Sequence, residues 1–100
     1  SIGMLSEYMI WLMDWEDKQR EYVRTKDRYL WQCLTSMRNY HDNLDQVLLL
    51  MESLKSKKIR RTTWIKNYQK LRKHQILCRY WDNKLMGYTK LYKKLKDNPV

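Results

Sequence analysis

The sequence is poor in residues that interrupt regular structure, and it lacks two common core residues altogether. In 100 residues it holds two glycines and one proline, with no alanine and no phenylalanine. Glycine and proline mark the turns that join strands, and from Met4 to Asn98 only Gly87 is of either type. An all-β fold is therefore excluded. Without alanine and phenylalanine, we expect a core of bulkier side chains, with tryptophan, tyrosine and methionine prominent.

Cysteines and long apolar runs are also scarce. The two cysteines, Cys33 and Cys78, lie far apart in the sequence, whereas small secreted scaffolds usually carry four or more. No apolar run approaches the length of about 20 residues that spans a bilayer, and no export signal is visible. We expect an intracellular protein, cytoplasmic or nuclear. The chain begins at Ser1 rather than methionine, which leaves open that it is a fragment of a longer protein.

Charge is abundant and unevenly distributed. The formal net charge is +10, and 43% of the residues are hydrophobic. Residues 1–50 carry six basic and eight acidic side chains, whereas residues 51–100 carry fifteen basic and three acidic ones. This composition predicts a single domain over residues 1–100, which folds alone and buries about 60 to 70% of the surface of its unfolded chain.

Apolar residues recur every three or four positions, which indicates helices. One such stripe predicts a helix over residues 26–56 and consists of Leu30, Cys33, Met37, Tyr40 or His41, Leu44, Val47, Met51 and Leu54. A heptad seam predicts another over residues 63–96 and consists of Trp64, Asn67 or Tyr68, Leu71, His74, Cys78, Trp81, Leu85, Tyr88, Tyr92 and Leu95.

A third helix is predicted over residues 4–21, from a shorter seam of Leu5, Tyr8 or Met9, Leu12 and Trp15. The stripe fades in the charged stretch 16–28, so we place a turn between about Arg20 and Lys26, with Thr25 as N-cap. A single helix over 4–57 is the alternative. A second turn is predicted in residues 56–63, with Thr62 or Thr63 as cap. Short connections force neighbouring helices to be antiparallel, so the predicted fold is all-α, an elongated antiparallel three-helix bundle with coiled-coil-like packing.

This layout resembles a spectrin repeat. The similar motifs are IWLMDWE, with Trp11 and Leu12, SMRNYHDNL, with His41, and LCRYWDNKL, with Trp81 and Leu85. The resemblance implies a non-catalytic scaffold, with Trp11 and Trp81 anchoring the core.

His74 and Cys78 lie one helical turn apart, the spacing that two metal ligands on a helix require. A hairpin centred near residue 59 brings His41 level with Cys78, where it could be a third ligand. Cys33 stays about 12 Å from that level along the helix axis, so no fourth ligand is available. His74 and Cys78 both occupy the heptad seam, where packing in the core is the simpler interpretation. Because the sequence also has no Gly-rich phosphate loop and no paired-carboxylate site, we expect no metal, cofactor, catalytic residue or small-molecule substrate.

The basic surface is the most informative feature. We predict that it binds a partner through Lys55, Lys57, Lys58, Arg60, Arg61, Lys66, Lys70 and Lys73. The expected partner is another protein, with an acidic surface. The alternative is a nucleic acid or an anionic membrane surface bound by the cluster 55–61 and the outer side of the last helix. The aromatic residues of that helix follow its seam, so we expect them to be buried rather than free to stack on bases.

Two tryptophans lie beside their stripes rather than on them. Trp11 and Trp31 are candidate exposed aromatic anchors, since tryptophan is enriched where partners bind most strongly. In the other interpretation they widen the core.

Overall fold

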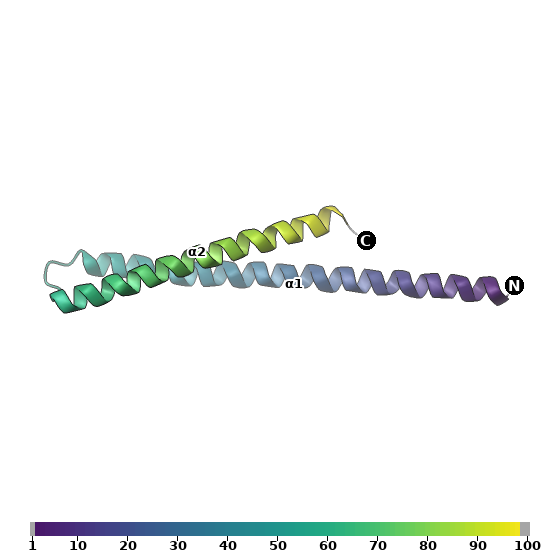
Figure 1. Ribbon diagram of the computed structural model, residues 1–100, viewed down its shortest axis with the longest axis horizontal. Helices are drawn as coiled ribbons and strands as arrows, with labels where there is room; N and C mark the ends of the chain where they lie inside the picture. The colour runs from purple at the N-terminus through teal and green to yellow at the C-terminus, as the bar shows by residue number, and fades with distance from the viewer. Residues whose placement is uncertain (1, 99–100) are drawn as a thin grey trace.

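The chain is a helical hairpin in which two long helices lie side by side (Figure 1). This computed structural model describes the backbone of residues 2–98 and the side chains of residues 6–98. Helix α1 spans Ile2–Leu54, helix α2 spans Arg61–Asp97, and residues 55–60 join them. The molecule measures 88 × 19 × 13 Å, and its radius of gyration of 24.1 Å far exceeds the ~13 Å of a compact domain of this length.

The three-helix bundle predicted from the sequence is wrong. The expected turn between Arg20 and Lys26 does not form, because α1 continues through it without interruption. Thr25, which we expected to cap a new helix, instead donates its hydroxyl to the Glu21 carboxylate at 3.2 Å, one turn earlier. The all-helical and elongated character of the prediction is confirmed.

Local ion pairs explain why the charged stretch stays helical. Four pairs between side chains three or four positions apart span it: Lys18 with Asp14 at 3.0 Å, Arg20 with Glu16 at 3.9 Å and with Asp17 at 3.8 Å, and Arg24 with Glu21 at 3.9 Å. Each exposed pair of this kind contributes only about 0.3–0.5 kcal/mol. Extending a helix that already exists requires no nucleation, so small local gains are sufficient where no glycine or proline intervenes.

The turn between the helices lies where the sequence placed it, but its cap differs. Helix α2 begins at Arg61, before either threonine proposed as cap. Arg60 precedes it in an extended conformation and makes no side-chain cap. Its carbonyl accepts the first helical hydrogen bond, from the Trp64 backbone N–H at 2.8 Å.

The two helices pack through one seam each, with the alternating steps of three and four that define a coiled coil. In α2 the buried and half-buried residues are Asn67, Leu71, His74, Cys78, Trp81, Leu85, Tyr88, Tyr92 and Leu95, as the heptad predicted, together with Leu77. In α1 the seam consists of Tyr29, Cys33, Ser36, Tyr40, Asn43, Val47, Leu50 and Leu54. The predicted α1 stripe is thus only partly right, since Leu30, Met37 and Met51 are exposed.

Contacts between side chains of the two helices fix the register of the hairpin. They include Asn67 Nδ2 to Ser53 Oγ at 2.7 Å, His74 Nδ1 to Asn43 Oδ1 at 2.8 Å, Cys33 Sγ to Thr89 Oγ1 at 3.8 Å, and the rings of Tyr29 and Tyr88 at 6.5 Å. Continued along the helices, this register places Asp97 level with about residue 21. We call residues 2–20 of α1 the overhang and residues 21–54 its paired part. Figure 1 shows the overhang running on past the end of α2.

A two-helix interface leaves much of the chain in contact with solvent. Among the described side chains only Val47, Leu71 and Ser36 are buried, and Ser36 is the most completely covered of the three. An unfolded chain of 12.6 kDa exposes about 18,000 Å², and the hairpin still exposes 8704 Å². The chain therefore buries about half of its surface, less than the 60 to 70% expected of a compact domain.

Candidate interaction surface

The basic residues predicted to bind a partner lie together on the turn and on the adjoining part of α2. Lys55, Lys57, Lys58 and Arg60 belong to the turn, Arg61 opens α2, and Lys66, Lys70 and Lys73 follow on its first four turns, all of them exposed. The two helices differ sharply in charge. Helix α1 carries six basic and nine acidic residues, whereas α2 carries eleven basic and two acidic residues.

The cations of α2 are not neutralised within the described residues. Each ion pair there joins residues of α1, apart from one between Lys55 and Glu52 at the turn. On α2, Arg72 donates to the Gln75 side chain at 2.9 Å, and the Lys84 amine lies 5.5 Å from the centre of the Tyr80 ring. Neither contact cancels charge, so α2 and the turn together carry a large excess of positive charge.

An aromatic pair lies beside the basic turn. Trp64 and Tyr68 stack with ring centres 5.5 Å apart and planes 4° apart, and their exposed fractions are 40% and 44%. The expectation that Trp64 is buried in the seam is therefore wrong, because its ring stacks on Tyr68 at the surface of the first turns of α2. Trp81, Tyr88 and Tyr92 are half-buried between the helices, as expected.

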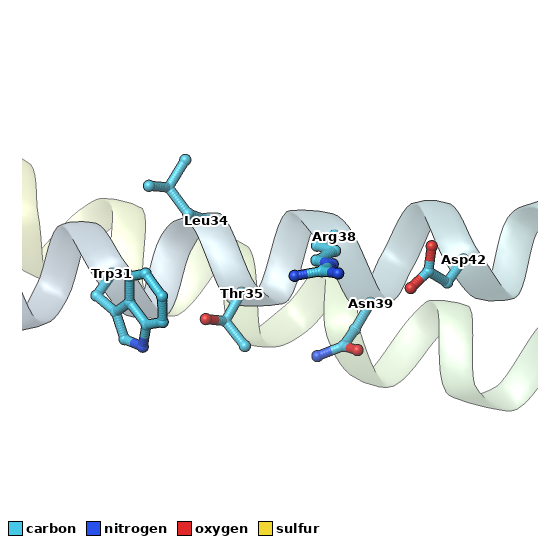
Figure 2. Close-up of a pocket in the computed structure, with 6 residues that line it drawn as sticks. All are labelled: Trp31, Leu34, Thr35, Arg38, Asn39 and Asp42. Carbon is cyan, nitrogen blue, oxygen red and sulfur yellow. The ribbon is translucent and has the colours of Figure 1, made fainter.

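Both candidate anchors, Trp11 and Trp31, are exposed, with 58% and 68% of their surface accessible. Trp11 lies on the overhang and Trp31 on the paired part of α1. A hollow of about 460 Å³ next to Trp31 is lined by Leu34, Thr35, Arg38, Asn39 and Asp42. Figure 2 shows that all six side chains come from α1 alone. A hollow formed by one helix is a shallow depression, so it offers a partner a surface rather than an enclosed pocket.

His74 and Cys78 lie in the seam and take part in packing. The Asn43 amide nitrogen donates to the Asn39 carbonyl at 2.8 Å, so its oxygen faces His74 and accepts from Nδ1 at 2.8 Å. The Cys78 thiol points to the Tyr40 carbonyl at 3.9 Å. Burial raises the pKa of the Cys78 thiol, which keeps it in the neutral form that is a poor nucleophile and a poor metal ligand. Nowhere in residues 6–98 do three His, Cys, Asp or Glu side chains gather as a metal site requires.

A second apolar stripe on α1, which the sequence pattern did not separate from the first, lies about a quarter turn round the helix from the seam with α2. We call it the outer stripe, and it consists of Tyr8, Leu12, Trp15, Val23, Leu30, Leu34, Met37, Leu44, Leu48 and Met51. Leu12 and Leu44 are half-buried and the other eight are exposed. Its residues were assigned to the core because the two stripes are only one position apart in the sequence. The sequence did contain a signal for it, because the apolar face of α1 is wider than a single neighbouring helix can cover.

Comparisons with models of known families, with curated proteins and with solved structures found no match to this chain. They bear neither for nor against the resemblance to spectrin repeats. Across the described residues, neither helix contains a segment apolar enough to cross a membrane.

Proposed function

We propose that this chain is a non-catalytic interaction domain that binds another protein through the basic surface of α2 and the turn. The observation that carries the proposal is the separation of charge between the helices. Helix α2 and the turn together carry fifteen basic residues, eleven on α2 and four on the turn, and only two acidic ones. Within the described residues, no basic residue of α2 forms an ion pair. A protein with an acidic surface is the partner that this excess of positive charge attracts most directly.

The continuity of the two helices supports the same function. Both helices are continuous, and the seam between them is long, so the cations stay at fixed spacings along one rod. A partner that matches this spacing binds without ordering a flexible loop, which lowers the entropic cost of association. The exposed tryptophans Trp11 and Trp31 add apolar contacts on α1 for a partner that reaches around the hairpin.

Nucleic acid is the second candidate, and one observation favours it. The stacked rings of Trp64 and Tyr68 lie exposed directly after the cluster 55–61. Aromatic rings next to basic residues bind single strands by stacking on bases while the cations contact phosphates. An acidic peptide needs the charges but not the rings, so the two candidates differ in what substitution of the rings does.

A titration against two labelled probes distinguishes the candidates. The probes are a glutamate-rich peptide and a single-stranded DNA of equal net charge, and binding to the full chain is measured by fluorescence anisotropy at increasing salt. We expect the peptide to bind more tightly than the DNA at physiological salt. Reversal of Lys66, Lys70 and Lys73 to glutamate should weaken peptide binding by roughly a hundredfold, as expected for the loss of several charge contacts.

The matched control reverses three cations of α1, namely Arg24, Arg28 and Arg38, which changes the net charge by the same amount. It should weaken peptide binding by less than about threefold, because only long-range charge is altered. Equal losses in both variants would contradict a local surface on α2. The second candidate prevails if DNA binds more tightly, with a steep salt dependence that flattens when Lys57, Lys58, Arg60 and Arg61 are replaced.

A further inference from the structure

The outer stripe of α1 has a symmetric pattern of spacing. On the overhang the stripe includes Tyr8, Leu12 and Trp15 and its line continues to the polar Gln19, and on the paired part it includes Met37, Leu44 and Leu48 with the polar His41 between them. Both runs advance by four, three and four residues, so one is the mirror image of the other about residue 28. When a second α1 is laid antiparallel about that point, position 8 meets 48, position 12 meets 44, and position 15 meets 41. Steps of three and four on both helices are what interlocking side chains require.

The amount of exposed surface is consistent with a partner as large as a second copy. A compact monomer of 12.6 kDa exposes about 6,200 Å², so this hairpin, at 8704 Å², exposes about 2,500 Å² more. Stable interfaces bury about 1,200–2,000 Å² in total. The outer stripe supplies ten apolar side chains per copy over almost the whole length of α1, and between Tyr8 and Met51 its line includes two charged residues of opposite sign, Glu16 and Lys26.

Charge selects the antiparallel orientation. The overhang carries four acidic and two basic residues, whereas the turn and first residue of α2, positions 55–61, carry five basic and no acidic ones. In an antiparallel pair about residue 28, the overhang of each copy lies level with residues 36–54 of the other, and the two basic turns lie at opposite ends of the pair. In a parallel pair, the two basic turns lie next to each other and repel. Helix α2 is a poor alternative surface for self-association, because each copy of it carries eleven basic and two acidic residues.

We infer that the outer stripe of α1 is a self-association surface, on which a second copy of this chain lies antiparallel with α1 against α1. The overhang of each copy then covers the outer side of the paired part of the other, in the place where the predicted three-helix bundle had a third helix. The seam with α2 lies on a different side of α1 and remains intact. This inference concerns α1, whereas the proposed function concerns α2, so each stands or fails separately.

Sedimentation equilibrium of the full chain, with matched variants, tests whether the stripe is used. Leu48 lies on the outer stripe and its neighbour Leu49 does not, although Leu49 is the more exposed of the two. We expect a dimer whose dissociation constant rises roughly a hundredfold in Leu48→Glu, because a carboxylate is then enclosed between apolar helices. Leu49→Glu should change the constant by less than about threefold, since its side chain stays in water.

A variant on the overhang guards against simple unfolding. Leu12 lies beyond the end of α2, so Leu12→Glu leaves every contact of the hairpin in place. It should weaken the dimer as much as Leu48→Glu does, while the helical circular dichroism of the diluted monomer is unchanged. A wild-type chain that remains monomeric, or a dimer that is equally sensitive to Leu48→Glu and Leu49→Glu, would refute the inference.

Disulfide cross-linking tests the orientation. In a chain with Cys33→Ser and Cys78→Ser, we introduce Leu12→Cys in one sample and Leu44→Cys in another, and oxidise each with glutathione disulfide. Antiparallel pairing predicts a covalent dimer when the two samples are mixed and little when each is oxidised alone. Cross-linking of each sample alone would show a parallel pair, and no cross-link in the mixture would show that another partner, or none, covers the stripe. Either result overturns the inference.

Discussion

The paired part and the overhang of α1 are one helix with two different surroundings. Both are rich in apolar and charged residues, and both are helical. On the paired part, α2 covers a seam that includes the buried side chains of Val47 and Ser36. On the overhang, no described residue covers the exposed side chains of Tyr8, Met9, Ile10, Trp11, Met13 and Trp15.

The difference teaches that continuity of a helix and burial of a helix have separate causes. Continuity is local, since good helix formers, ion pairs one turn apart and an existing helical end are enough to carry it forward. Burial depends on what lies alongside, and here that is decided by the length of α2. The overhang is therefore well formed as a helix but contributes little to the stability of the hairpin.

The largest expected effect comes from a matched pair of proline substitutions, which tests whether continuity and burial of α1 have separate causes. Asp42 on the paired part and Asp14 on the overhang are both exposed aspartates in the same helix. Proline inside a helix costs about 3 kcal/mol or more. We expect Asp42→Pro to lower the free energy of unfolding by about that amount in urea denaturation at monomeric concentrations.

Asp14→Pro should leave the hairpin's free energy of unfolding within about 0.5 kcal/mol of wild type, because the segment before it unwinds without breaking the seam. Its effect should appear as a loss of helical circular dichroism from the overhang. Equal losses of stability in the two variants would mean that the overhang packs within the monomer.

The sequence predicted helicity, the position of the turn and most of the α2 seam, because each depends on local pattern. Period and composition identify a helix, and the basic turn sequence separates two of them. The alternative of one helix over 4–57 was close to what forms, as Ile2–Leu54. The end of an apolar stripe near Arg20 was taken as the end of a helix. In fact α1 continues as a helix there, and only its coverage by α2 ends.

The seam of α1 was harder to predict, because two of its members are polar. Among residues 6–98, Ser36 is the most buried side chain and Asn43 is half-buried, yet neither has the apolar character by which a core is found. Leu30 and Met37 do have apolar character, yet they lie beside the seam and are exposed. A wide apolar face can meet one helix or two, and the sequence of one chain gives no information about a partner outside it. The location of the basic surface could be predicted, while its partner could not.

A smaller effect sharpens the contrast between covered and uncovered apolar residues. Leu71 is 8% exposed in the seam, and Leu49 is 64% exposed on α1. Leu71→Ala should cost about 2–3 kcal/mol, through lost burial and the cavity that remains. Leu49→Ala should stay within about 0.5 kcal/mol of wild type. Urea denaturation monitored by tryptophan fluorescence measures both, and a cost for Leu49→Ala close to that of Leu71→Ala would show that a partner already covers it.

The smallest effect concerns what fixes the register within the paired part. His74 and Asn43 share a half-buried hydrogen bond at 2.8 Å, and Arg72 and Gln75 share an exposed one at 2.9 Å. A double-mutant cycle with alanine at both positions of each pair should give a coupling energy of about 1 kcal/mol for the first pair. For the second pair it should be below about 0.3 kcal/mol, because water replaces an exposed hydrogen bond at little cost.

The reason lies in the neighbours of the first pair. The Asn43 amide already donates to the Asn39 carbonyl, so its oxygen has one remaining direction, which leads into the seam. If His74 is removed, or if α2 slides by one heptad, that oxygen loses its donor where water has limited access. A polar pair of this kind adds little to total stability but penalises every other register. Equal coupling in the two pairs would mean that apolar packing alone aligns the helices.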